Sequence, residues 1–240
     1  MTPRRALLAM LLAACAVPSR SAAEAPEDPF TPAEYAAAVG EVVSGFTVSA
    51  ILGPQETPLP LEVSNFLLDH PDMSAFIVNR RKIAPYRIVM LGPRRSRADD
   101  GEGTAGIVTL LEEDAHHRLY YGEGIHHSLL FPDIRAAAVI SMDLSEDGPA
   151  RTITTFHVWV RIRSRFVSRM VKTLRPFLQG TVIRKFSKAF FVADSVGRLM
   201  ARDPAGAAED FRAFPGLFVE DRAKILEMLA RLSPSVEPRR

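Results

Sequence analysis

The clearest pattern in the chain is an alternation of apolar and polar positions from Thr152 to Arg163. Phe156, Val158 and Val160 fall on one face of this segment, and the intervening positions are mostly polar, basic or aromatic. Successive side chains of a strand point to opposite faces, so the pattern predicts a β-strand with one dry face and one solvated face.

Shorter stretches upstream carry β-branched and aromatic residues with the same period of two, and we expect each to form a strand. From Tyr86 onward only short turns separate these stretches, which is typical of an antiparallel meander and not of a parallel sheet with helical crossovers. The predicted strands are Gly45–Ile51, Tyr86–Leu91, Gly106–Glu113, Arg118–Glu123, His127–Phe131 and Ala136–Leu144.

A different spacing follows the last predicted strand. From Phe166 to Met200 the apolar residues recur mainly three or four positions apart, which predicts a long amphipathic helix. Pro176 and Gly180 lie inside this segment, and they predict a kink or a break in the helix.

Shorter helices are predicted on either side of the strands. Thr31 offers an N-cap and Pro32 suits the first helical position, so a helix should begin there and run to about Val39. Further short helices are predicted at Leu61–Leu68, Asp72–Asn79, Gly206–Ala213 and Val219–Leu232, the last two packing on the outside of the domain.

The first 23 residues are typical of an export segment. Arg4 and Arg5 precede the apolar run Ala6–Ala14, which is too short to cross a bilayer because a span needs about 20 residues. We therefore expect an exported chain, in a bacterial periplasm. The segment that ends at Cys15 resembles a lipobox, in which the thiol is acylated and anchors the mature protein to a membrane. The alternative is ordinary cleavage after Ala23.

The composition is that of a globular protein, with 240 residues of which 47% are hydrophobic and 24% charged. This excludes a disordered chain, a fibrous repeat and a protein with many membrane spans. The single cysteine excludes an internal disulfide framework, and a net charge of +2 excludes binding to nucleic acid through bulk charge alone.

Charge is sorted along the chain. The segments Arg80–Arg97 and Arg161–Lys188 carry basic residues without any acid, whereas the segment between them is rich in acids. Basic runs are usually solvated surface. Their functional interpretation is docking to an anionic membrane surface, worth about 1 kcal/mol per basic residue near the membrane. Nucleic acid is not an expected partner of an exported chain.

Two motifs in the acidic segment are weak. Gly101–Gly106 has the spelling GxGxxG, but nucleotide binding needs a strand before the motif and a helix after it. Here a charged loop precedes it and a strand-like stretch follows, so a hairpin turn is the better interpretation and no cofactor is expected. Asp99–Glu102 could bind a cation, yet it lacks the ligand spacing of an EF-hand, which favours a solvated turn.

Histidines are the remaining chemical candidates. Two His-His pairs bracket a predicted hairpin, and His157 lies on a later strand. Neighbouring residues on a strand point to opposite faces, so the three or four convergent ligands of a zinc site are not expected. Acid–base chemistry is the alternative, and its candidate residues are His117, His127 and His157 with Glu123 or Asp100.

The order of elements resembles the START-like superfamily, also called the helix-grip or SRPBCC fold. The resemblance is carried by the strand Phe46–Ile51, by Pro60–Asp69 leading into Asp72–Phe76, and by the amphipathic Phe166–Met200. It covers residues 45–200, with the export segment 1–23 before it and a helical extension, 206–232, after it. It implies an α+β fold in which a curved antiparallel sheet wraps around the long helix, with a cavity between them.

Members of this superfamily bind sterols, phospholipids, polyketides or other apolar molecules, and some are cyclases or hydrolases. The leading hypothesis is therefore an exported protein that binds a lipid or other apolar ligand and is held near a membrane. An enzyme of the same fold that uses histidine, and a non-catalytic interaction module of the cell envelope, are the alternatives. The candidate lining, any member of which could simply be core, is Phe156, Val158, Val160, Leu174, Phe177, Phe186 and Phe190.

Overall fold

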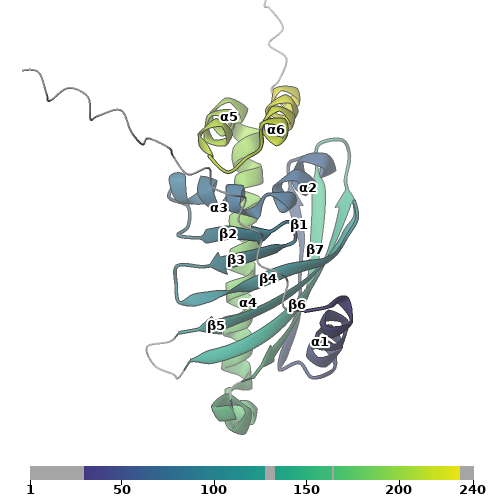
Figure 1. Ribbon diagram of the computed structural model, residues 1–240, viewed down its shortest axis with the longest axis vertical. Helices are drawn as coiled ribbons and strands as arrows, with labels where there is room; N and C mark the ends of the chain where they lie inside the picture. Colours follow the sequence, from purple (N-terminus) through teal and green to yellow (C-terminus); the bar gives the residue numbers. More distant parts are fainter. Residues whose placement is uncertain (1–29, 128–132, 164, 233–240) are drawn as a thin grey trace, which may run out of the picture.

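The computed structural model describes residues 30–127, 133–163 and 165–232, without the side chains of residues 165–178 and 181 (Figure 1). Runs of strands and runs of helices occupy separate parts of the chain, which is typical of an α+β fold. The elements are α1 (Pro32–Ser44), β1 (Val48–Thr57), α2 (Leu61–Asp69), α3 (Pro71–Arg80), β2 (Arg87–Gly92), β3 (Arg95–Asp99), β4 (Thr104–Glu113), β5 (His117–His126), β6 (Ile134–Glu146), β7 (Thr152–Ile162), α4 (Arg165–Arg202), α5 (Pro204–Ala213) and α6 (Val219–Leu232).

The strands form one seven-stranded antiparallel sheet in the order β1-β7-β6-β5-β4-β3-β2. Strands β2 to β7 pair with their neighbours in sequence, and β1 adds to the far edge, where Val48 lies opposite Val160. Helix α4 runs along one face, here called the inner face, and α1 packs on the opposite, outer face (Figure 1). This is the helix-grip architecture predicted from the order of the elements.

A pair of glycines brings β4 and β5 unusually close. Gly106 lies directly opposite Gly124. A Cβ on Gly106 would lie 2.5 Å from the carbonyl oxygen of Glu123, and one on Gly124 would lie 2.8 Å from that of Ala105. Neither contact is tolerable, so this approach of the two backbones requires glycine at both positions.

The inner face and α4 share one tightly packed cluster. Phe156, Val158 and Val160 are buried on β7, and Phe186 and Phe190 of α4 pack against them. The rings of Phe156 and Phe190 are stacked, with centroids 3.5 Å apart. The dry face predicted for this strand is therefore confirmed.

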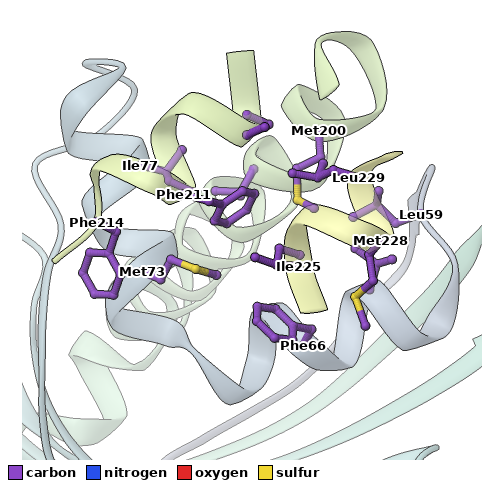
Figure 2. Close-up of a cluster of buried hydrophobic side chains, with 14 of the residues drawn as sticks. Leu59, Phe66, Met73, Ile77, Met200, Phe211, Phe214, Ile225, Met228 and Leu229 are labelled. Carbon is purple, nitrogen blue, oxygen red and sulfur yellow. The ribbon is translucent and has the colours of Figure 1, made fainter. Parts of the chain in front are cut away.

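A second cluster joins α2 and α3 to α5, α6 and the C-terminal end of α4 (Figure 2). Its centre includes Met73, Phe211, Ile225 and Met228, all at most 1% exposed. Helices α5 and α6 were expected on the outside of the domain, but they supply about a third of the buried residues of this core. Their apolar stripes face α2 and α3, which themselves lie over one end of the sheet (Figure 1).

Several element boundaries differ from the sequence-based expectation. Strand β3 was not predicted, because its five residues, Arg95–Asp99, are mostly charged. The predicted strand at His127–Phe131 does not form at His127, which follows the end of β5, and its other residues lie outside the described part. Helix α4 is one continuous helix across Pro176 and Gly180, so of the predicted kink or break the break does not occur. Over its 38 residues it extends for about 57 Å.

Candidate functional site

A cavity of about 510 Å³ lies on the inner face of β2–β5, beside the junction of α2 and α3. Met90, Val108, Leu110 and Tyr120 share the face of their strands that points towards α2, and Leu68 closes one side. The remaining lining is more polar than this floor. It consists of Asn65, Asp69, Pro71, Pro93, Arg94, Arg95, Ser96, Glu113, Asp114, Ala115 and Arg118.

Arg118 is the buried charge of this cavity. Its side chain is 4% exposed, and its Nη2 donates to Asp69 Oδ1 at 2.8 Å and to Asn65 Oδ1 at 3.1 Å. Its Nε and Nη1 are buried and have no hydrogen-bond partner. Burial acts to lower the pKa of Arg118, but Tyr120 and Asp69 outweigh this effect and the pKa is raised, so the side chain remains a cation.

The carboxylates near Arg118 differ in how they are engaged. Asp114 Oδ1 accepts the backbone N–H groups of His116 and His117, both at 2.7 Å, and these bonds lower the pKa of Asp114. Glu113 Oε2 lies 3.9 Å from Arg118 Nη1, which is an ion pair without a hydrogen bond. Of these two carboxylates at the rim of the cavity, Glu113 is therefore the more weakly held.

The residues expected to line a ligand site do not line this cavity. Phe156, Val158, Val160, Phe186 and Phe190 occupy the packed cluster beneath α4. Leu174 and Phe177 belong to α4, but their side chains lie outside the described part of the structure, as does Cys15. The hollow opens beside the packed crossing of sheet and helix.

Arg118 was missed, although a signal for it exists in the sequence. Arg118 lies two positions before Tyr120 on β5, and side chains two positions apart on a strand share a face, here the inner one. An arginine at an inward position of a strand is rare unless it is paired. By charge alone, Arg118 stands out only as one of the few basic residues of an acidic segment.

The candidate acid–base residues do not converge. His117 and Glu123 lie an even number of positions from Tyr121 on β5, so all three side chains share one face. Tyr121 packs beneath α1, which places them on the outer face. His157 stacks on Trp159, also part of the cluster beneath α1, with ring centroids 3.7 Å apart. The residues are held separately: His117 Nδ1 lies 2.9 Å from Asp143, His127 Nδ1 lies 2.7 Å from Asp133, and Glu123 pairs with Arg163. Within the described residues, no group of three His, Cys, Asp or Glu side chains could hold a metal ion.

The turn with the GxGxxG spelling connects β3 and β4, as the hairpin interpretation predicted. Its acids face α4: Lys185 Nζ lies 2.7 Å from Asp100 Oδ2, and Lys188 pairs with Glu102. Burial acts to raise the pKa of Asp100, but hydrogen bonds from Lys185 and from the backbone N–H groups of Thr104 and Glu102 outweigh it and lower the pKa. The turn is thus an ion-paired contact between sheet and helix.

A second hollow, a groove of about 750 Å³, lies on the outer face. Four arginines line it with a single carboxylate, Glu123, which Arg163 contacts at 2.6 Å. Arg97 and Arg135 are exposed and make no ion pair with the described residues. The lining is Phe30, Tyr35, Arg95, Arg97, Ala105, Gly106, Ile107, Thr109, Tyr121, Glu123, Gly124, Ile125, Arg135, Ala136 and Arg163.

No helix in the described ranges has the length and apolar character needed to cross a membrane.

Comparison with models of protein families, and with curated proteins, found no match. Solved structures of similar fold were found. A conserved protein from Geobacillus kaustophilus is 14% identical over 62% of this chain and 93% of its own, with a TM-score of 0.45. A START superfamily protein from Mycobacterium smegmatis is 10% identical over 61% and 93%, with a TM-score of 0.39. A truncated norcoclaurine synthase from Thalictrum flavum is 11% identical over 61% and 91%, with a TM-score of 0.40. Likenesses of this size concern the fold alone, and the structural neighbours are START-like, as the order of elements in the sequence suggested.

Proposed function

We propose that this protein binds an apolar or amphipathic small molecule in the inner-face cavity. The observation that carries the proposal is a hollow of about 510 Å³ over an apolar floor. Ligand pockets typically measure about 300–1,000 Å³, and they combine apolar walls with a few fixed polar groups. Met90, Val108 and Leu110 supply such a wall, and Arg118 is a polar group held in place by α2.

Binding is favoured over acid–base catalysis by the positions of the histidines. His117 and His157 lie on the outer face, and the described lining of the cavity contains no histidine. The interaction-module hypothesis would need a large apolar patch on residues 206–232. Most apolar side chains there are buried in the second cluster, and Phe218 and Val219 are the large apolar residues that stay exposed.

Filling the cavity should abolish ligand binding. We expect the neutral fluorophore N-phenyl-1-naphthylamine to bind with one site per chain, and Val108→Trp to weaken binding at least tenfold because the indole occupies the hollow. Fluorescence titration measures both affinities. Val89→Trp is the matched control, since Val89 is 59% exposed on β2 and does not line the cavity. Equal binding by both variants, or no binding by the unmodified protein, would refute the proposal.

We further propose that the chain is exported and tethered to a membrane, with Cys15 acylated or with cleavage after Ala23 as the alternative. Phe30 lines the outer groove and lies fifteen residues after Cys15. Fifteen extended residues reach at most about 50 Å, so an acylated Cys15 would keep this groove near the membrane. Four arginines around the groove make its lining complementary to anionic headgroups.

Anionic vesicles should therefore bind this face. A form that begins at Glu24 should sediment with phosphatidylcholine vesicles only when they contain phosphatidylglycerol. Arg97→Gln with Arg135→Gln should weaken that binding roughly thirtyfold, because each basic residue near the membrane contributes about 1 kcal/mol. Arg202→Gln with Arg212→Gln removes the same charge at the far end of the molecule, where both residues are exposed, and should change little. Equal losses in the two double variants would show that the groove has no special part in docking. Acylation itself is measured from the intact mass of the chain purified from cell membranes.

A further inference from the structure

We propose that the ligand of the inner-face cavity is an amphipathic molecule with one carboxylate, and that Arg118 binds this carboxylate. The inference rests on the proposed function, and it adds the chemical class of the ligand and the residue that selects it. Neither the predicted lining nor the likeness to other folds contains this information. It comes from the hydrogen-bonding state of the cavity wall.

Unpartnered donors gather at this cavity. In the described residues, four buried side-chain nitrogen or oxygen atoms have no hydrogen-bond partner: Nε of Arg95, Nε and Nη1 of Arg118, and Nε of Arg222. Two of the four belong to Arg118, which lines the cavity. Arg95 lies opposite Thr109, whose side chain contacts Tyr35 on the outer face, so the unpartnered Nε of Arg95 belongs to the other side of the sheet. Buried polar groups in folded proteins are nearly always paired, and a donor left without an acceptor is destabilising. An acceptor supplied by a ligand would remove this deficit.

The guanidinium of Arg118 is already held in place. Asp69 Oδ1 at 2.8 Å and Asn65 Oδ1 at 3.1 Å both accept from Nη2. Asn65 is itself fixed, because its Nδ2 donates to the carbonyl of Ala115 at 3.0 Å. Helix α2 thus fixes one nitrogen of the group and leaves Nε and Nη1 without a hydrogen bond, with Glu113 Oε2 3.9 Å from Nη1. A ligand that binds to them loses little free energy in ordering the Arg118 side chain, because folding has already fixed it.

The carboxylates around the cavity leave Nε and Nη1 of Arg118 without a hydrogen-bond acceptor. Asp69 is paired with Arg118, and Asp114 is engaged by two backbone N–H groups. Glu113 lies 3.8 Å from Arg94 and 3.9 Å from Arg118, both beyond hydrogen-bond distance, and its side chain is 44% exposed. A ligand carboxylate would supply the missing acceptor, and arginine pairs strongly with that group.

The rest of the cavity suits the apolar body of such a molecule. Leu68, Met90, Val108 and Leu110 offer no hydrogen-bond donor and no acceptor stronger than the Met90 thioether, so they satisfy a second polar group poorly. The site therefore distinguishes the two ends of its ligand. The carboxylate lies at Arg118, and the apolar body lies on the floor formed by β2 and β4.

Three probes with the same ten-carbon body test this assignment in the unmodified protein: decanoate, methyl decanoate and decanol, titrated by calorimetry at pH 7.5. Decanoate should bind at least tenfold more tightly than the ester or the alcohol. The ester keeps the oxygen acceptors without the charge, so equal binding of acid and ester would overturn the anionic assignment. Equal binding of acid and alcohol would overturn the inference and leave the cavity-binding function intact. Failure of all three to bind would overturn both.

Arg118→Gln identifies the residue. It should weaken decanoate at least tenfold and leave decanol unchanged, which a general loss of folding would not do. Arg222→Gln is the matched control, because Arg222 also has a buried, unpartnered Nε, while its Nη2 donates to the carbonyls of Phe214 and Leu217, away from the cavity. An equal loss of decanoate binding in both variants would overturn the role of Arg118. If Arg118→Gln does not fold, as judged by circular dichroism, the comparison of probes in the unmodified protein decides the ligand class by itself.

Discussion

Replacing Phe211 by alanine should lower the free energy of unfolding by about 4 kcal/mol. Phe211 lies on α5 and is 0% exposed, at the centre of the cluster shared by α2, α3, α5 and α6 (Figure 2). Removing the ring loses its burial and leaves a cavity that rigid helices on several sides cannot close. Guanidinium denaturation followed by circular dichroism measures the change.

Phe218→Ala provides the matched control for this experiment. Phe218 follows α5 by five residues and is 78% exposed, so the same change of residue should cost less than about 0.5 kcal/mol. If the two variants lost the same stability, α5 would not share a core with α2 and α3, and residues 206–232 would be an appended extension.

Asp210→Asn should lower the free energy of unfolding by about 3 kcal/mol. The Asp210 side chain is 3% exposed, and its two oxygens accept from Arg80 Nε at 2.9 Å and from Arg81 Nε at 2.7 Å. An amide would turn an N–H group towards one of these donors, leaving a buried group unpaired. Arg80 and Arg81 are partly exposed and regain water, so the loss should lie at the low end for buried ion pairs.

Glu209→Gln separates this effect from the loss of charge. Glu209 is exposed on the same helix, one residue away, and its substitution removes an equal charge without breaking either contact to α3. It should change the free energy of unfolding by no more than about 0.5 kcal/mol. A comparable loss in both variants would mean that net charge, and not the buried contact, stabilises the junction of α3 and α5.

The elements that the sequence predicted well are those with a strong local period. The alternation from Thr152 to Arg163 gave β7 and its dry face. Helix α2 begins directly after Pro60, and α3 begins at Pro71. Strand β3 was missed because it is a short, charged strand with little apolar alternation. Its pairing with β4 and β2 comes from the sheet around it and not from its own residues.

The cavity lies on the face of the sheet where the sequence predicted a ligand site, but away from the predicted lining residues. Phe156 and Phe190 were expected to border a hollow, and they stack on each other instead. Periodicity identifies the side chains that face inward. It does not contain the distance between the two surfaces, and that distance decides whether large side chains fill the gap or leave it open.

The basic and acidic segments show the same limit. Arg80 and Arg81 belong to a run that suggested a membrane-docking surface, yet Asp210, about 130 residues further along, engages both. Lys185 likewise contacts Asp100 across 85 positions. Such pairs depend on the fold because they join elements that are distant in sequence.

By itself, the sequence of this protein determined the period of each long element, the face that each one buries, and the α+β order that resembles a helix-grip fold. These are local properties, since a strand or an amphipathic helix needs only its own residues to define an apolar side. Only the tertiary structure decided where the cavity opens, that Arg118 forms part of its wall with two nitrogens unpaired, and that the last two helices share a core with α2 and α3. Volume and hydrogen-bond pairing are properties of surfaces brought together by folding, so no single segment carries them.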